Sequence, residues 1–184
     1  MSKSVFIRVV ITGEAGQGAI FAGIVLAEAA VSTGLYVTQS SVTGAAVRSG
    51  ETECHVVIAS EPMRYPYVDS PDVLIALSAD AAIRRAESAV PGGYFLYDSD
   101  LLNAPPPCRA KTVPVPATKA LRRAGLPPGN ENLIFLGALS ELETPISIRS
   151  LTAGLSRTLS APSEVAATAL LLGASLIGEG RKMS

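Results

Sequence analysis

The sequence has no tryptophan, only two cysteines and a single histidine among its 184 residues. Aromatic residues make up 5%, whereas hydrophobic residues make up 48%. The core must therefore be mostly Val, Ile, Leu and Ala, which suits helices on a buried, largely parallel sheet. Cys54 and Cys108 are too few for a disulfide framework and too far apart for a C-x-x-C metal or iron–sulfur motif. We expect two reduced thiols and no metal site.

Excess charge and long apolar runs are also missing. The net charge is −1 and the isoelectric point is near 5.9, which offers little to a phosphate backbone, so we expect no nucleic-acid partner. The first ten residues do not resemble a signal peptide and are typical of a strand. The longest apolar run, 165–177, is shorter than the roughly 20 residues that a bilayer requires. We expect a cytoplasmic protein with no membrane contact.

Short apolar runs alternate with helical patterns, which is typical of an α/β fold. Strands are predicted over 4–12, 35–39, 53–59, 73–77, 94–98 and 111–115. Helices are predicted over 80–89, from Asn130 to Leu142, over 146–159, and from Pro162 and Glu164 onward. An earlier helix, ended by Gly34, is predicted to turn Ile20, Ile24, Ala27 and Val31 toward the core. The expected fold is one domain, 1–184: a Rossmann-like three-layer α/β/α fold with a mostly parallel sheet and a helical C-terminal third.

A glycine-rich loop links the first strand to that helix and is the most informative stretch. It contains Gly13, Gly16, Gln17 and Gly18. Glycines permit positive φ and close approach, and the helix that follows offers unpaired N–H groups and a positive dipole end. Such a loop binds phosphate, carboxylate or a partner's backbone, although it also permits simple tight packing. The G-x-x-G-x-G order matches neither the dinucleotide fingerprint nor the P-loop.

A second loop, 40–51, contains Gly44 and Arg48. If the first two strands are parallel, this loop leaves the sheet at the same end as the glycine loop. Arg48 could then bind a carboxylate or phosphate in bidentate fashion. The alternative is a solvated arginine held by Glu51 or Glu53.

No catalytic constellation is recognisable. His55 alternates with hydrophobic neighbours along a strand, which favours a hydrogen-bonded structural histidine over a catalytic base. There is no Gly-x-Ser-x-Gly motif, and the aspartates form no recognisable acid/base pair. We expect a binding surface without catalytic residues of its own.

Taken together, these segments resemble the gamma subunit of 2-oxoacid:ferredoxin (acceptor) oxidoreductases. The glycine loop stands where that family has G-x-G-G-Q-G, and Val42–Gly50 stands where it has a Y-G-x-x-x-R-G-G-like segment. The stretches 70–77 and 132–139 are similar to its P-D-x-L-I-A-L and N-x-x-x-L-G-A-L motifs. The chain departs from the family pattern at Ala15, Val42-Thr43 and Ser49.

The resemblance implies a subunit that is not active alone. Alpha, beta and possibly delta subunits would carry thiamine diphosphate, magnesium and iron–sulfur clusters. The complex would decarboxylate a 2-oxoacid oxidatively, with coenzyme A taking the acyl group and ferredoxin or a flavodoxin the electrons. A separate short gamma chain points toward 2-oxoglutarate, while pyruvate and other oxoacids stay open. The glycine loop, Gly44 and Arg48 would face coenzyme A or a partner subunit.

Two alternatives stay open from the residues alone. One is a free-standing nucleotide- or coenzyme A-binding protein of Rossmann type, and the other is a non-catalytic adaptor. The isolated chain could also form a homodimer through an apolar face made for an absent partner.

Overall fold

The computed structural model describes residues 4–43, 50–159 and 163–181. Within them one six-stranded sheet has the order β2-β3-β1-β4-β5-β6. The strands are β1 (Phe6–Glu14), β2 (Tyr36–Thr43), β3 (Glu51–Ala59), β4 (Val73–Ala76), β5 (Tyr94–Asp98) and β6 (Lys111–Val115). The helices are α1 (Ala19–Ser32), α2 (Ala79–Arg85), the 3₁₀ turn η2 (Ala86–Ser88), α3 (Ala117–Arg123), α4 (Glu131–Leu139), α5 (Ile148–Thr158) and α6 (Glu164–Arg181).

The sheet is mixed because one strand runs against the other five. β1, β4, β5 and β6 pair in parallel, whereas β3 pairs antiparallel with both β1 and β2. Only residues 44–50 lie between β2 and β3, and a parallel pair needs a crossover connection of about a dozen residues or more. The prediction of a mostly parallel α/β sheet is therefore confirmed, with β3 as the exception. β1 and β2 run in the same direction.

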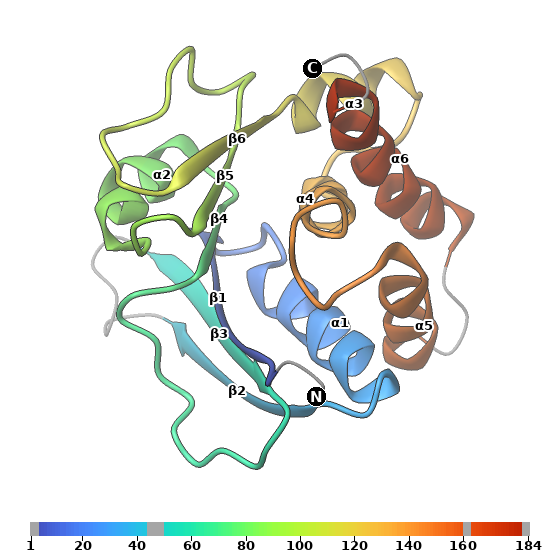
Figure 1. Cartoon of the computed structure of the whole chain (residues 1–184). Coiled ribbons are helices and arrows are strands. Elements are labelled where there is room, and N and C mark those ends of the chain that lie inside the picture. The colour runs from blue at the N-terminus through green and yellow to red at the C-terminus, as the bar shows by residue number, and fades with distance from the viewer. Residues whose placement is uncertain (1–3, 44–49, 160–162, 182–184) are drawn as a thin grey trace.

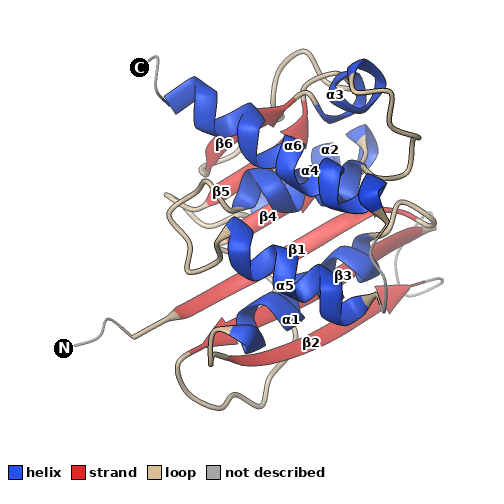
Figure 2. Cartoon of the chain, turned by 90° about the vertical axis from the view of Figure 1, so that its right-hand side faces the viewer, coloured by secondary structure: helices blue, strands red, loops and turns tan. Residues whose placement is uncertain are grey.

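Helices cover the two faces of the sheet unequally (Figure 1). α2 lies on one face, while α1 and α4 lie on the other, where they are covered in turn by α5 and α6. Figure 2 looks onto this thicker side. The larger core cluster fills the space between the sheet and α1, α4 and the outer helices, and a smaller cluster lies under α2. The three layers and the helical C-terminal third are as predicted.

The predicted core face of α1 is wrong at Ile24 and Val31, whereas Ala27 packs against the core as predicted and Ile20 is half-buried. Ile24 and Val31 are 38% and 48% exposed, and the buried positions are small or medium-sized: Ala19, Ala22, Gly23, Val25, Leu26, Ala29 and Ala30. α1 lies between the sheet and α5, and a Cβ at Gly154 of α5 would collide with the backbone of Val25 and Ala29. Because both neighbours approach so closely, most of the buried positions hold alanine or glycine, with Val25 and Leu26 as the larger exceptions.

The predicted boundaries agree best with the structure for the short strands β4, β5 and β6. β5 and β6 have the predicted ends, and β4 is buried along its whole length. β2 extends four residues beyond its predicted end because it pairs with β3 as far as Thr43. α3 was not predicted, and Pro162, the predicted start of the last helix, lies outside the described residues. Among the described helices, none is both long and apolar enough to cross a bilayer.

Candidate functional site

The glycine loop lies at the point in the sheet where the order of the strands changes direction. β1 leads through α1 to one side of the sheet, and neighbouring β4 leads through α2 to the other. Open α/β sheets bind ligands beyond the carboxyl ends of their strands at such a switch point. The two strand ends are joined directly, since Leu77 N–H donates to the Thr12 carbonyl at 2.8 Å. The loop therefore occupies the position where this fold class forms its sites.

The second loop begins and ends at the same edge of the sheet. β1 and β2 both pair antiparallel with β3, so their carboxyl ends lie together. Ala15 N–H donates to the Gly50 carbonyl at 3.2 Å, which joins the two loops. Gly44 and Arg48 lie outside the described residues, so their contacts stay predictions.

The backbone of the glycine loop is only partly as predicted. Gly16 and Gly18 have φ values of 92° and 77°, which favour glycine. Gly13 does not share this conformation: it lies in β1, and a Cβ there would come within 2.6 Å of Gln17 Oε1 and 2.9 Å of Leu77 Cβ. Its glycine is needed for packing, which corrects the expectation of a positive φ. Glu14, Ala15 and Gly16 are exposed, so the tip of the loop is open to a ligand or partner.

Gln17 holds the loop closed on itself. Its Oε1 accepts a hydrogen bond from Glu14 N–H at 2.7 Å, and its own N–H donates to the Glu14 carbonyl at 3.1 Å. One function of this side chain is thus structural. Contact between Gln17 and a cofactor stays a prediction.

Sequence reasoning missed Asn132, which fixes the end of the loop. Its Nδ2 donates to the Gly18 carbonyl at 3.1 Å, and a Cβ on Gly18 would collide with that amide. Asn132 is buried in the first turn of α4, 114 residues further along the chain. It opens the segment 132–139 that carried part of the family resemblance, and that motif was the signal that could have identified it.

The N-terminus of α1 differs from those of the other described helices. Its N-cap is Gly18, which has no side chain to accept from the first N–H groups, and its first turn has no acidic residue. α2, α5 and α6 receive caps from Ser78, Ser147 and Ser163. Carboxylates of Asp98 and Asp100 accept from the first N–H groups of α3, and Glu131 lies in the first turn of α4. The α1 terminus therefore keeps donors and a positive dipole end for another molecule.

A pocket of about 320 Å³ lies beside this terminus. Its lining comes from the glycine loop and the ends of β4, β5 and their neighbours: Gly16, Gln17, Leu77, Asp98, Leu101, Thr118, Gly129 and Glu131. The Asp98 carboxylate is already used, because it accepts from Asp100 N–H and from the N–H and hydroxyl of Thr118. Glu131 also faces the pocket, and among the described residues no basic side chain lines it. These side chains suit neutral groups better than free anions.

A polar network anchors the start of β3 to α2. Arg84 donates from Nη2 and Nε to Glu51 Oε1 at 2.6 and 3.0 Å, and Arg85 Nε lies 2.9 Å from Glu53 Oε1. Both carboxylates are at least 89% buried. These acids, which were candidates for holding Arg48, are thus paired with arginines of α2.

His55 completes the network as a structural side chain, as predicted. Its Nδ1 accepts from Val68 N–H at 2.9 Å, which leaves Nε2 to donate to Glu53 Oε2 at 3.0 Å. Burial acts to raise the pKa of the Glu53 carboxyl, but the His55 hydrogen bond and the Arg85 charge outweigh it and lower the pKa. Both ring nitrogens of His55 are occupied, so the ring has no free nitrogen for proton transfer.

The two thiols are free. Cys54 is fully buried under α1, and burial raises the pKa of its thiol to about 11 although Gln39 Nε2 donates to its sulfur at 3.3 Å. Cys108 is half-buried. Within the described ranges, no three His, Cys, Asp or Glu side chains gather around a possible metal position.

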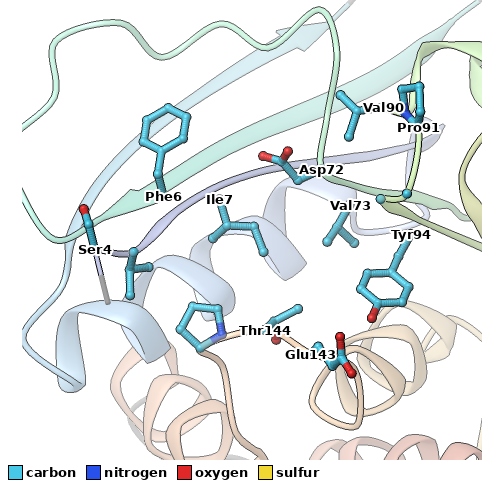
Figure 3. A pocket seen from close by; sticks show the side chains of 14 residues that line it. Ser4, Phe6, Ile7, Asp72, Val73, Val90, Pro91, Tyr94, Glu143 and Thr144 are labelled. Atoms are coloured by element: carbon cyan, nitrogen blue, oxygen red, sulfur yellow. The ribbon is translucent and has the colours of Figure 1, made fainter. Parts of the chain in front are cut away.

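A larger pocket, about 540 Å³, lies at the opposite end of the sheet (Figure 3). It is bounded by the first residues of β1, β4 and β5 and by the loop between α4 and α5, including Phe6, Tyr94 and Glu143. The Asp72 carboxylate on its wall is consumed by Arg8, which donates to both of its oxygens at 2.9 Å. Because this pocket lies at the amino ends of the parallel strands, the glycine-loop edge is the better candidate site.

Comparison with known proteins agrees with the family resemblance. Residues 8–174 match the model of the pyruvate ferredoxin/flavodoxin oxidoreductase family. The chain is 32% identical to the 2-oxoglutarate synthase subunit KorC of Methanothermobacter marburgensis, over 94% of this chain and 97% of that subunit. It is 36% identical to KorC of Methanothermobacter thermautotrophicus over 76% of this chain and 78% of that subunit.

Solved structures show the same relationship. The gamma subunit of a keto/oxoacid ferredoxin oxidoreductase from Geobacter sulfurreducens superposes with a TM-score of 0.80 at 28% identity, over 94% of this chain and 99% of that one. A 2-oxoglutarate:ferredoxin oxidoreductase chain from Magnetococcus marinus, in a structure with 2-oxoglutarate, coenzyme A and succinyl-CoA bound, superposes with a TM-score of 0.75 at 25% identity. That match covers 97% of this chain but 31% of the longer one. The chain belongs to the pyruvate ferredoxin/flavodoxin oxidoreductase family, as a gamma-type subunit.

Proposed function

We propose that this chain is the gamma subunit of a 2-oxoglutarate:ferredoxin oxidoreductase and that its glycine-loop edge faces the active site formed with other subunits. The observation that carries the substrate class is the sequence similarity to the KorC subunits of 2-oxoglutarate synthases, which are 36% and 32% identical over most of both chains. The ketoisovalerate oxidoreductase subunit VorA is 35% identical over 74% of this chain, but this chain covers only 28% of that longer one.

The reaction is the oxidative decarboxylation of 2-oxoglutarate to succinyl-CoA and CO₂, with the electrons passed to ferredoxin. Thiamine diphosphate, magnesium and iron–sulfur clusters are held by alpha and beta subunits, with or without a delta subunit. The cysteines of this chain do not fit an iron–sulfur cluster, because there are only two and one of them, Cys54, is a buried thiol under α1. The contribution of this chain is to shape and close the site, not to react.

The glycine loop supplies backbone donors at that site. The open tip at Gly16 and the uncapped start of α1 offer N–H groups to a phosphate of coenzyme A or to a partner's carbonyl. Since the adjacent pocket is lined by Asp98 and Glu131, the positive charge for a phosphate must come from elsewhere. Arg48, on the neighbouring loop, is the residue we propose for this role. We place the complex in the cytoplasm.

Isolation of the tagged chain from its native host tests the proposal. We expect co-purifying subunits, bound thiamine diphosphate, iron and sulfide, and coenzyme A-dependent reduction of a viologen dye with 2-oxoglutarate in preference to pyruvate and 2-oxoisovalerate. Turnover by the chain alone would contradict the proposal, as would a co-purified complex that lacks iron and thiamine diphosphate.

A pair of matched variants tests the site within that complex. Gly16 and Gly34 both have positive φ values, 92° and 82°. At both positions no atom lies within 4 Å of the place that an added Cβ would take. Alanine at either position costs similar backbone strain, but only Gly16 is at the proposed site. We expect Gly16→Ala to raise the KM for coenzyme A several-fold and Gly34→Ala to leave it unchanged. Equal effects of the two variants would remove the loop from the site.

A further inference from the structure

The two edges of the sheet are built differently (Figure 2). The β6 edge is five residues long and contains Pro114, which has no N–H, and the charged Lys111. Proline and lysine are the residues by which edge strands avoid pairing with another chain. The β2 edge is eight residues long, Tyr36–Thr43, and contains neither a proline nor a charged residue. It lacks the protection that the other edge has.

The outer side of β2 is left without backbone partners in the described part of the chain. All eight residues pair with β3 on the inner side. The backbone groups of every second residue point away from β3, and the described loops and helices form no backbone hydrogen bond with them. The loop after β3 contacts a side chain of β2, since Ser40 Oγ donates a hydrogen bond to the Pro66 carbonyl at 3.1 Å. This contact covers a face of the strand and uses none of its backbone groups.

From these features we propose that β2 pairs antiparallel with β2 of a second copy of this chain, which joins two sheets into one. The strand is complementary to itself. In the register centred on Gln39, Tyr36 lies opposite Val42 of the second copy and Thr38 lies opposite Ser40. Aromatic residues pair favourably with β-branched residues across antiparallel strands, and the two-fold axis repeats this pair. Because the strand has no charged side chain, no like charges meet.

Tyr36 gives this contact apolar area as well as backbone hydrogen bonds. It is 50% exposed, and Phe6 lies on the same row across the sheet, since both residues pair with Ala59. Phe6 is 61% exposed. Large exposed aromatic side chains near an unprotected strand are typical of surfaces buried by a partner. The β2 edge runs along the side of the sheet, whereas the glycine loop lies beyond the carboxyl end of β1. Dimerisation through β2 therefore leaves the glycine loop free.

Sedimentation velocity of the isolated chain over a wide range of concentrations tests the proposal. We expect a monomer–dimer equilibrium and, by hydrogen exchange, slower exchange of the 36–43 amides as concentration rises. Ser41→Lys places a charge on the exposed β2 edge, and we expect it to raise the dimer dissociation constant about tenfold or more. The matched control is Thr112→Lys on exposed β6, which should leave the constant unchanged.

Three results would overturn the proposal. They are a monomer at every concentration, a dimer equally sensitive to both lysine variants, and a dimer whose 36–43 amides exchange as fast as in the monomer. Since the test uses the isolated chain, it is independent of whether the oxidoreductase complex is found.

Discussion

The Asn132 side chain donates from Nδ2 to the Gly18 carbonyl at 3.1 Å, and so joins the start of α4 to the start of α1. Asn132 is 4% exposed, and its Oδ1 accepts from Leu133 N–H at 2.9 Å. The amide thus contributes to two hydrogen bonds in a place that water does not reach. The shape of the glycine loop depends on the C-terminal helices as well as on its own glycines.

Asn132→Ala should lower the free energy of unfolding by about 1 kcal/mol, because it removes one of the two hydrogen bonds that the Gly18 carbonyl accepts, while the other, from Ala22 N–H, stays. Urea denaturation followed by circular dichroism measures the change. Asn130→Ala is the control, since the Asn130 amide donates to the Pro127 carbonyl in an exposed turn. If Asn132→Ala and Asn130→Ala lower the free energy of unfolding equally, the contact of Asn132 with Gly18 contributes no more to stability than the exposed contact of Asn130 does.

Gly18→Ala should be more destabilising than Gly34→Ala. Alanine at either position meets a positive φ, which costs about 1–2 kcal/mol. At Gly18 the new Cβ also collides with the Asn132 amide, whereas at Gly34 no atom lies within 4 Å. The difference in unfolding free energy between the two variants isolates the collision, and combining Gly18→Ala with Asn132→Ala should recover part of it. An additive double variant would mean that the two residues act independently.

Removing the charge of Glu53 should destabilise the fold and change its response to acid. Its folded-state pKa lies below the ordinary value of 4.5, so the ionised carboxylate stabilises the folded state. That stabilisation is complete above pH 4.5 and is lost as the pH falls through the lowered pKa. We expect Glu53→Gln to cost about 2 kcal/mol at neutral pH and to show a shallower loss of stability on acidification.

The control for Glu53→Gln is Glu61→Gln, at an exposed position on the loop after β3. It should change neither the stability at neutral pH nor the acid dependence by a measurable amount. An unchanged acid profile in Glu53→Gln would show that the network of His55, Glu53 and Arg85 does not couple folding to protonation.

Thiol labelling should separate the two cysteines. Cys54 is fully buried and the pKa of its thiol is raised to about 11, so at neutral pH it is both protonated and shielded. Iodoacetamide should modify half-buried Cys108 and leave Cys54 unmodified until the chain unfolds. Peptide mass mapping gives the result directly. Rapid labelling of Cys54 in the folded chain would mean that α1 separates readily from β3.

The sequence predicted those parts of the fold that depend on local patterns. β5 follows the break at Pro91-Gly92-Gly93 and β6 ends before Pro116, and both strands have the predicted ends. The direction of β3 was not predicted, because the predicted ends of β2 and β3 left residues 40–52 between them, enough for a crossover, whereas only residues 44–50 separate the two strands. The core face of α1 was wrong because burial there follows from two close neighbours, the sheet and α5, and not from the size of the α1 side chains.

The position of the glycine loop between β1 and α1 was predicted, but its contacts were not. The contact of Gly18 with Asn132 depends on packing between segments far apart in the chain, which no local pattern reveals. The pairing of Glu51 and Glu53 with Arg84 and Arg85 depends likewise on the position of α2. The predicted roles of Gly44 and Arg48 stay predictions, as does the single domain over 1–184.

The contact between α4 and α6 has a consequence for movement. A Cβ on Gly137 of α4 would collide with the Leu170 carbonyl of α6, and one on Gly173 of α6 would collide with the Ile134 carbonyl of α4. Two backbones interlocked in this way cannot slide along one another without first separating. Any displacement within this part of the chain must therefore carry α4 and α6 together as one rigid unit.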